Sequence, residues 1–202
     1  MAEAARNDER DQAWAGFDVP IPPAELVAFC QDVERLFRIN PYLEFDRWEC
    51  LGEGSWQVRG RNLSRQPPLA FDLTLRAEPR PDGLLIRYQG GLKASTRFLV
   101  EPAEKGSHLT IVDDYGALDE ASRRARLDEV DRSLVKWAEE LQAWLLRWQR
   151  WSGFAPWRWF MRRVWLPMKP AGRRITYILL LISVAELALI GLGVAIYLAE
   201  YR

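Results

Sequence analysis

Four polar side chains interrupt an otherwise apolar set of positions in this sequence. Tyr88, Thr96, Asp113 and Tyr115 share the alternation of the apolar residues in three segments that have the pattern of strands. Alternate residues of a strand point to the same face of a sheet, so we expect all four on its apolar face. A few donors and acceptors in an apolar interior can orient a ligand that is held mainly by burial. The pattern therefore predicts a binding site for a lipophilic molecule with one polar end.

Other interpretations of these residues stay open at this point. Large aromatic side chains can fill a core completely, which would leave Tyr88 and Tyr115 at the rim of a solid interior. Asp113 lies shortly before Gly116, and an Asp beside a loop commonly caps a turn. Acid and base work by Asp113 and Tyr115 is a third interpretation.

The sequence offers no familiar catalytic or metal-binding set. It contains one histidine, His108, and two cysteines, Cys30 and Cys50, which do not form a C-x-x-C motif. These residues do not make a zinc site, a Cys/His pair or a Ser/His/Asp triad. We therefore expect no catalytic residues, no metal and no cofactor, and the protein is read as a binding protein rather than an enzyme. Both cysteines are expected to be buried and reduced.

The charge of the chain is balanced overall but divided unevenly along it. There are 28 Lys and Arg and 28 Asp and Glu, and residues 151–202 hold 7 and 2 of them. The tail therefore has a net charge of +5, and the remaining 21 basic and 26 acidic residues give −5. A balanced chain offers no field for nucleic acid, which we exclude as a partner. Residues 1–12 are charged, lack the apolar run of a signal peptide and are expected to be a disordered lead-in.

One segment has the length and composition of a membrane span. Residues 175–198 are 24 residues with a single charge, and a helix of that length rises ~36 Å, against about 30 Å of hydrocarbon. Basic residues gather before the span, and of the four residues 199–202 only Arg202 is basic, which places the N-terminal domain in the cytoplasm. The sequence predicts a single-pass tail anchor in a bacterial-type inner or plasma membrane.

The one charge of the span, Glu186, lies near its middle. Ser183, Gly193 and Tyr197 fall on the same helical face, and the opposite side is Leu, Ile and Val. An ionised carboxylate at mid-bilayer costs ~2.5 to 3.5 kcal/mol, so Glu186 needs a proton or a partner. This face predicts docking to another transmembrane protein or self-association. A polar residue that the anchor simply tolerates is the alternative.

Residues 151–174 connect the body of the chain to the span and are rich in Trp and Arg. Most of the apolar side chains fall on one helical face, namely Trp157, Phe160, Met161, Val164 and Trp165. Arg158 and Arg162 fall on another face, and Trp159 does not fit the pattern. We expect an amphipathic helix in the headgroup region, with its indoles at the interface and its arginines toward anionic lipid.

Residues 13–150 have the pattern of one domain of strands and helices. Segments such as PLAFDLTLRAEP and GLKASTRFLVEP alternate apolar and polar residues, and turn sequences such as RPDG and EKG separate them. These features predict a meander of antiparallel strands with one apolar face. Residues 22–42 predict helix that stops at Asn40-Pro41, and a long helix is expected from about Asp119 to Trp151. Its apolar stripe includes four tryptophans, which suit a wide gap above a sheet.

The order of these elements resembles the START-like superfamily, also called the SRPBCC or polyketide cyclase/dehydrase and lipid transport-like group. The resemblance covers about residues 13–150 and rests on one strand, two short helices, the Ile39-Asn40-Pro41 stop, six strands and a terminal helix. It implies an α+β helix-grip fold, in which a curved antiparallel sheet wraps a long helix around an apolar cavity. The cavity of that family accepts lipids, sterols, quinones or polyketides. Phe98, Trp137 and Trp144 would then line it together with the four polar residues.

These observations lead to one hypothesis and two alternatives. The hypothesis is a membrane-anchored START-like protein that binds a hydrophobic lipid or isoprenoid-type ligand at the cytoplasmic membrane surface, for transport or presentation. The first alternative is an accessory or assembly subunit of a membrane complex that docks through the Glu186 face. The second is a cyclase-like enzyme that acts on a hydrophobic substrate, which the resemblance implies, with Asp113 and Tyr115 as acid and base.

Overall fold

The alternating segments form an eight-stranded antiparallel sheet within the part of the chain that the computed structural model describes, residues 3–7, 12–64, 66–91, 93–116 and 127–200. The strands are β1 (Glu3–Asn7), β2 (Gln12–Val19), β3 (Leu43–Gly52), β4 (Ser55–Asn62), β5 (Leu69–Arg80), β6 (Gly83–Gln89), β7 (Ser95–Ala103) and β8 (Gly106–Asp114). Their order across the sheet is β1-β2-β8-β7-β6-β5-β4-β3. Strands β3 to β8 are therefore the predicted meander, each paired with its neighbour in the chain.

Two short helices carry the chain from β2 to the far edge of the sheet. They are α1 (Pro23–Cys30) and α2 (Val33–Ile39). Asp32 separates them and caps α2 by accepting a hydrogen bond from the Arg35 backbone N–H at 3.2 Å. Helix α2 ends directly before Asn40-Pro41, as predicted, because the residue before a proline is disfavoured in the helical conformation.

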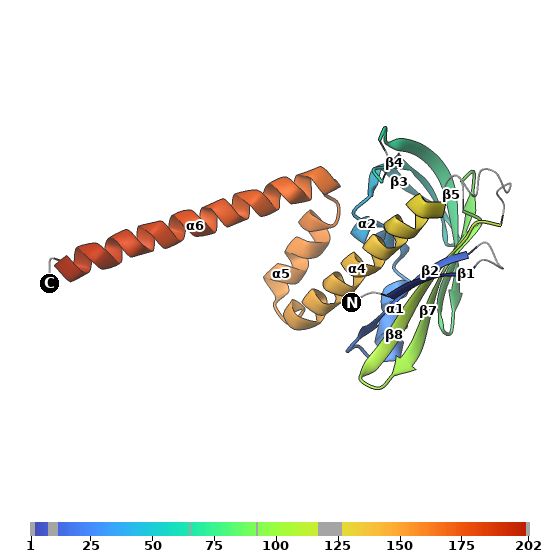
Figure 1. Ribbon diagram of the computed structural model, residues 1–202, viewed down its shortest axis with the longest axis horizontal. Coiled ribbons are helices and arrows are strands. Elements are labelled where there is room, and N and C mark those ends of the chain that lie inside the picture. Colours follow the sequence, from blue (N-terminus) through green and yellow to red (C-terminus); the bar gives the residue numbers. More distant parts are fainter. Residues whose placement is uncertain (1–2, 8–11, 65, 92, 117–126, 201–202) are drawn as a thin grey trace. The chain divides into compact units, whose positions relative to one another are not determined.

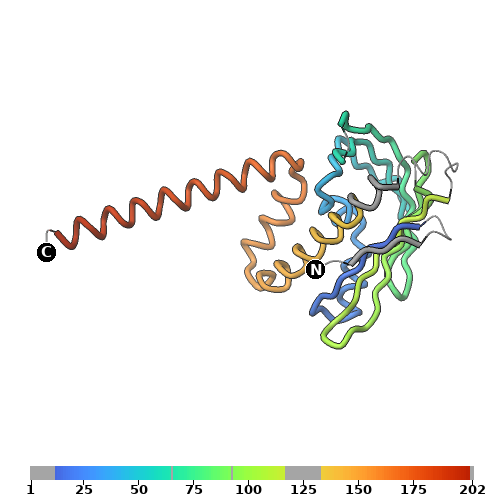
Figure 2. The backbone as a smooth tube through the Cα atoms, viewed as in Figure 1, coloured from blue at the N-terminus to red at the C-terminus, as the bar shows by residue number. Residues whose placement is uncertain are grey.

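The long helix α4 (Leu127–Trp151) lies along the curved inner face of the sheet, with α1 and α2 beside it (Figures 1 and 2). Its stripe Leu134, Trp137, Leu141 and Trp144 is buried against apolar side chains of the strands. This arrangement is the predicted α+β helix-grip fold. The expected first turns of the helix, from about residue 119 to 126, and Leu92 of the predicted strand lie outside the described residues.

Strand β1 occupies part of the segment for which a disordered lead-in was expected. It pairs antiparallel with β2, from Glu3 opposite Gly16 to Asn7 opposite Gln12. Without β1, strand β2 would be an edge strand with a row of unpaired backbone groups. Backbone pairing, which does not depend on an apolar side-chain pattern, therefore explains a strand that the composition did not suggest.

The segment after α4 folds back on the domain as α5 (Ala155–Phe160) and the π-helix η1 (Met161–Trp165). The Trp157 ring lies 5.5 Å from the Trp148 ring, and Met161 is buried in the core of the domain. The sequence pattern placed Trp157 and Met161 in the membrane interface, and this is wrong because they cover the end of the α4 stripe. Phe160 of the predicted face is exposed, and the other exposed Trp and Phe side chains of the described residues are Trp151, Phe154 and Trp159.

The chain divides into two compact units, residues 1–167 and 168–202. The second contains α6 (Pro170–Glu200), the one described helix that is long and apolar enough to cross a membrane. Its 31 residues rise ~46 Å as an α-helix. The helix begins before the predicted span at Ile175, and it carries Ser183, Glu186, Gly193 and Tyr197 at exposed positions.

The two cysteines lie in different surroundings and are not joined. Cys30 is buried in α1, and this burial raises the pKa of its thiol to about 12. Cys50 is exposed on β3, contrary to the expectation that both are buried. Strand β3 is an edge strand with a register shift between Cys50 and Gly52, which leaves the end of the strand outside the core.

We expect one of the two thiols to react with Ellman's reagent in the folded chain at pH 8. Cys30 stays protonated and shielded there, because that pH lies well below its raised pKa of about 12. Absorbance at the release of thionitrobenzoate should count one thiol in the native protein and two in guanidinium chloride. Cys50→Ser should leave none reactive in the native state. Rapid modification of both thiols without denaturant would contradict the burial of Cys30.

Candidate functional site

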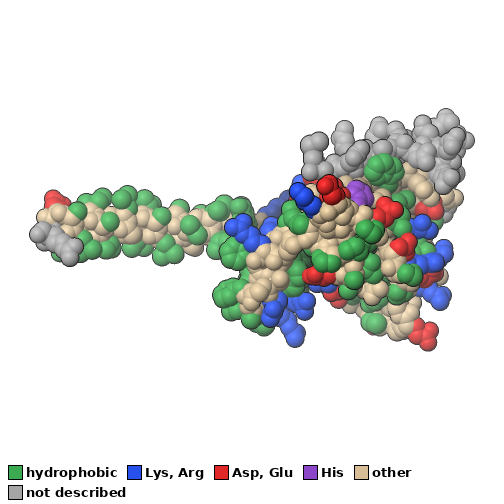
Figure 3. All heavy atoms as spheres, turned by 90° about the horizontal axis from the view of Figure 1, so that it is seen from below, with side chains coloured by type: hydrophobic (Ala, Val, Ile, Leu, Met, Phe, Trp, Pro, Cys, Tyr) green, Lys and Arg blue, Asp and Glu red, His purple; other side chains and the backbone are tan. Residues whose placement is uncertain are grey.

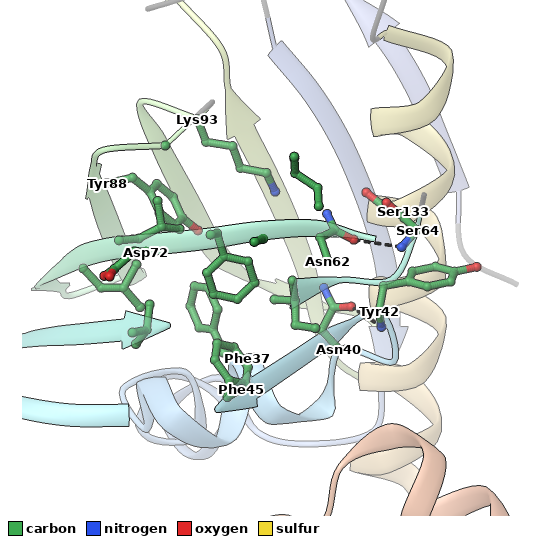
Figure 4. A pocket seen from close by; sticks show the side chains of 18 of the residues that line it. Phe37, Asn40, Tyr42, Phe45, Asn62, Ser64, Asp72, Tyr88, Lys93 and Ser133 are labelled. Atoms are coloured by element: carbon green, nitrogen blue, oxygen red, sulfur yellow. Dashed lines mark hydrogen bonds between the residues drawn. The ribbon is translucent and has the colours of Figure 1, made fainter. Parts of the chain in front are cut away.

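A cavity of about 510 Å³ lies inside the first unit, among α2, the strands β3 to β6 and α4 (Figure 4). This volume is within the range of about 300 to 1,000 Å³ that is usual for small-molecule pockets. Its wall is mainly apolar and includes Phe37, Phe45, Val58, Phe71, Leu75 and Trp137. The described residues therefore leave space beside Tyr88 and Tyr115, where a solidly filled core was the alternative, and this space is large enough for a small hydrophobic molecule.

The four polar residues singled out by the sequence form one hydrogen-bonded group at this cavity. Thr96 Oγ1 donates to Asp113 Oδ1, and the Tyr88 hydroxyl oxygen lies 2.8 Å from Thr96 Oγ1. Because Thr96 has a single hydroxyl hydrogen and gives it to Asp113, Tyr88 must donate to Thr96. The Tyr115 hydroxyl donates to Asp113 Oδ2 at 3.3 Å. Tyr88 and Tyr115 line the cavity, and Thr96 and Asp113 lie buried behind them.

Strand register explains why these residues meet. Thr96 lies opposite Asp113 across β7 and β8, and Ile86 lies opposite Thr96 across β6 and β7. Tyr88 is two residues beyond Ile86, so it points to the same face and reaches the Thr96 hydroxyl. Burial raises the pKa of Tyr88, and the negative charge of Asp113 raises it further. The phenol is therefore a neutral donor at physiological pH.

Lys93 completes the group and was missed by the sequence analysis. Its ammonium forms an ion pair with Asp113 Oδ2 and lies 5.9 Å from the ring centroids of both Tyr115 and Trp137. The alternation placed Lys93 on the wet face of a strand. It lies in the turn before β7, where that alternation does not apply. A buried carboxylate such as Asp113 needs a cation nearby, and a search of the sequence for that cation could have found Lys93.

Asp113 does not cap the turn at Gly116. The neighbouring Asp114 takes that role, since its Oδ1 accepts a hydrogen bond from the Gly116 N–H at 2.9 Å. Asp113 itself is 0% exposed, and the Lys93 side chain is 28% exposed. The carboxylate is thus held entirely by side chains of the site, and the ammonium is the group that faces the cavity.

The aromatic residues predicted for the site divide into two groups. Trp137 lines the cavity, and its Nε1–H donates to the Leu36 carbonyl at 3.1 Å. Phe98 is buried behind Trp137, with ring centroids 5.5 Å apart. Trp144 lies two turns further along α4, where it stacks on Trp148 with ring centroids 6.2 Å apart. Neither Phe98 nor Trp144 lines the cavity.

A second set of polar groups lies across the cavity from Tyr88 and was not predicted. Figure 4 shows Asn40, Tyr42, Asn62, Ser64 and Ser133 gathered there. The two Asn side chains stabilise local turns. Asn40 Oδ1 accepts a hydrogen bond from the Tyr42 N–H, and Asn62 Oδ1 accepts one from the Ser64 N–H, both at 2.9 Å. These are short-range turn contacts, which the sequence does not connect to a cavity.

The described residues contain no group of three or more His, Cys, Asp or Glu side chains that could hold a metal ion. The single histidine, His108, lies away from the cavity and pairs with Asp18 at 2.7 Å between Nδ1 and Oδ1. The chemistry offered by the site is therefore burial of apolar surface, together with hydrogen bonds from the Lys93 and Tyr88 group.

Comparison with known proteins supports the fold. The sequence matches no protein-family model and no curated protein. Among solved structures, a protein of Thermus thermophilus is 12% identical, with a TM-score of 0.53 over 67% of this chain and 97% of the other. A protein of Arthrobacter aurescens is 14% identical, with a TM-score of 0.53 over 72% and 91%.

A third similar structure is the human StarD13 lipid transfer and protein localization domain. It is 15% identical and covers 70% of this chain and 89% of its own, but the TM-score of 0.41 is too low to bear on function. Likeness at these identities shows the fold alone. What this chain binds has to be argued from its own cavity.

We expect Lys93→Met to lower the free energy of unfolding by about 3 kcal/mol, because it leaves the Asp113 carboxylate buried without a cation. The double variant Lys93→Met/Asp113→Asn removes both charges and should recover most of that loss. Denaturant titration of the chain in mild detergent, followed by near-ultraviolet circular dichroism, measures both. The exposed Lys105 is a matched control, and Lys105→Met should leave stability unchanged. Equal losses in the single and double variants would contradict a coupled pair.

Proposed function

We propose that this protein binds a hydrophobic lipid or isoprenoid-type molecule in the helix-grip cavity and presents or transports it at the cytoplasmic surface of the membrane. The observation that carries the proposal is the cavity of about 510 Å³, whose wall is mainly apolar and carries one ion-paired polar group. A filled core would have left room only for a structural role.

The charges at the site favour a ligand with a neutral polar end. The charges of the Lys93 ammonium and the Asp113 carboxylate cancel, so this group has no net charge that would attract an ionic ligand. Lys93 has three N–H donors and uses one on Asp113, which leaves donors for an oxygen of the ligand. The Tyr88 hydroxyl gives its hydrogen to Thr96, so its oxygen is an acceptor toward the cavity. A hydroxyl, ester or quinone oxygen on a long apolar body fits these groups.

The long apolar helix α6 supports a membrane location for this activity. A helix of this length and composition suits a bilayer, and six basic residues between positions 151 and 174, with no acidic one, precede its apolar stretch from Ile175. A membrane anchor would hold the cavity near the phase in which a hydrophobic ligand is dissolved. Exchange would then avoid a long path through water, where such a ligand is scarcely soluble.

Native mass spectrometry of the full chain released from detergent micelles tests ligand binding. We expect one hydrophobic molecule of constant mass per chain in the wild type. Leu73→Trp enlarges a side chain of the cavity wall and should abolish this adduct by filling its space. Leu99→Trp makes the same change on a strand position outside the cavity wall and should retain it. An empty wild type, or an adduct that survives Leu73→Trp, would contradict binding in the cavity.

A second candidate function is that of an accessory subunit of a membrane complex, and Glu186 is the observation that favours it. This carboxylate lies on α6 among apolar side chains, with Ser183, Gly193 and Tyr197 on the same helical face. Small and polar residues allow close approach and hydrogen bonding between transmembrane helices. The face is suited to another transmembrane segment or to a second copy of α6.

If the Glu186 face docks a partner helix, Glu186→Leu should abolish co-purification of the partner from mild detergent while membrane insertion is kept. Glu186→Gln preserves hydrogen bonding and should keep part of it. Leu181→Val lies on the opposite side of the helix and should have no effect. Quantitative mass spectrometry of the purified chain measures all three variants. Equal recovery of partners from Glu186→Leu and wild type would remove the docking role.

A further inference from the structure

We infer that the end of the domain formed by the last turn of α4 with α5 and η1 is itself a membrane-docking surface, which inserts aromatic side chains into the interface of an anionic bilayer. This inference rests on the proposal that α6 anchors the chain in a membrane. It does not depend on whether the cavity holds a ligand. The surface is defined by Trp151, Phe154, Trp159 and Phe160 and by the arginines among them.

The exposed aromatic side chains carry the argument. Trp151 is 49% exposed, Phe154 59% and Trp159 63%. Every Trp and Phe that is exposed in the described part of the chain lies between residues 151 and 160. A soluble domain gains nothing from four such side chains in water, and clusters of this kind mark sites of interaction.

The surface is held rigidly by its opposite side. Trp157 packs on Trp148, and Met161 and Leu166 are buried in the core of the domain. The exposed aromatic residues thus form the outer face of a helical hairpin, and the inner face of this hairpin packs on the domain. Trp159, which did not fit the amphipathic pattern of the sequence, is the most exposed of them. Because the apolar face of that pattern packs on the domain, Trp159 on another side of the helix is exposed.

The charges on this surface select the kind of partner. Residues 150–165 contain four arginines and no acidic residue. Arg162 lies over the Trp148 ring at 5.0 Å, and Arg35 of α2 lies over the same ring at 5.9 Å. No carboxylate pairs with Arg162 in the described part of the chain. Arg35 already pairs with Asp32, with 3.2 Å between Nε and Oδ2. Arg162 is therefore the guanidinium of this pair that suits a lipid phosphate.

Basic and apolar side chains also lie together in space at this end of the domain. Figure 3 shows blue Lys and Arg side chains next to green apolar ones around the position that α5 has in Figure 1. Indoles favour the boundary between headgroups and acyl chains, and arginines beside them reach lipid phosphates. A protein partner would have to bury these arginines against its own acids, whereas a bilayer supplies phosphate at the same depth as the indoles.

The chain itself brings this surface to the membrane. Four residues, 166–169, separate η1 from α6. The five steps from Trp165 to Pro170 span at most ~18 Å in an extended chain. An inserted α6 therefore keeps η1 within reach of the lipid headgroups. The aromatic and basic side chains described above suit that depth.

Depth measurement by fluorescence quenching tests this inference in the full chain. In a Cys50→Ser background the buried Cys30 does not label, so Trp159→Cys carries one nitrobenzoxadiazole label, and Lys105→Cys carries the control label. The chain is reconstituted in phosphatidylcholine vesicles with and without phosphatidylglycerol, and nitroxide-bearing lipids are the quencher. We expect at least threefold stronger quenching and a blue-shifted emission at position 159 relative to position 105.

The arginines are tested by the same readout. Arg162→Gln/Arg163→Gln should reduce quenching at position 159 in phosphatidylglycerol vesicles, with circular dichroism showing that the fold is kept. A second label, at Phe154→Cys, repeats the measurement, so the test does not depend on the Trp159 substitution leaving the hairpin unperturbed. Quenching at positions 159 and 154 no stronger than at 105, in a chain that resists alkaline extraction, would overturn docking while leaving the anchor intact. Equal quenching at position 159 without phosphatidylglycerol would overturn the anionic bilayer as the partner.

Discussion

The packing of Trp137 is the interaction on which the rest of the domain depends. Its ring lies 5.4 Å from Phe37 of α2 and 5.5 Å from Phe98 of β7, and its Nε1–H donates to the Leu36 carbonyl. One side chain thereby joins α4, α2 and the sheet. The same indole forms part of the cavity wall. Because it fixes the separation between helix and sheet, a bulky rigid ring keeps the space beside it open, where smaller side chains would let the two layers close.

A second constraint is the burial of the Asp113 carboxylate. A charge that is removed from water needs partners, and Lys93, Thr96 and Tyr115 supply them from three neighbouring segments. These hydrogen bonds are made within the wall rather than across the cavity. The wall therefore carries an ammonium at Lys93, yet the charges of the Lys93 and Asp113 pair are already balanced before any ligand arrives. Such a site selects a molecule by shape and by one or two hydrogen bonds, not by ionic attraction.

The sequence predicted the fold well where pattern and local chemistry agree. Alternation identified β4, β5, β7 and β8, and Asn40-Pro41 identified the end of α2, because both depend on residues close together in the chain. It also identified Tyr88, Thr96, Asp113 and Tyr115, since strand parity places them on one face. Lys93 was missed because it lies in a turn, and Asn40 and Asn62 were missed because only tertiary structure connects them to the cavity.

The helical segment after α4 shows a different limit of sequence analysis. A helical wheel correctly finds that Trp157 and Met161 share an apolar face, but it does not say what that face contacts. Two apolar environments were available, the lipid and the end of the domain. The nearby Trp148 stripe decided between them, and that neighbour is visible only when the chain turns back at residues 152–154.

The shortness of the link between η1 and α6 has a kinetic consequence. With α6 anchored in a bilayer, as proposed, the pocket would stay within a few nanometres of the membrane and would meet a hydrophobic ligand at its concentration in the membrane phase. Loading then becomes a local partition equilibrium, and an intrinsic affinity too weak for a freely diffusing carrier is sufficient. The same anchor would prevent the domain from diffusing to another membrane. Under that proposal an acceptor would have to come to the anchored protein, and the ligand would be handed over at one membrane rather than carried between two.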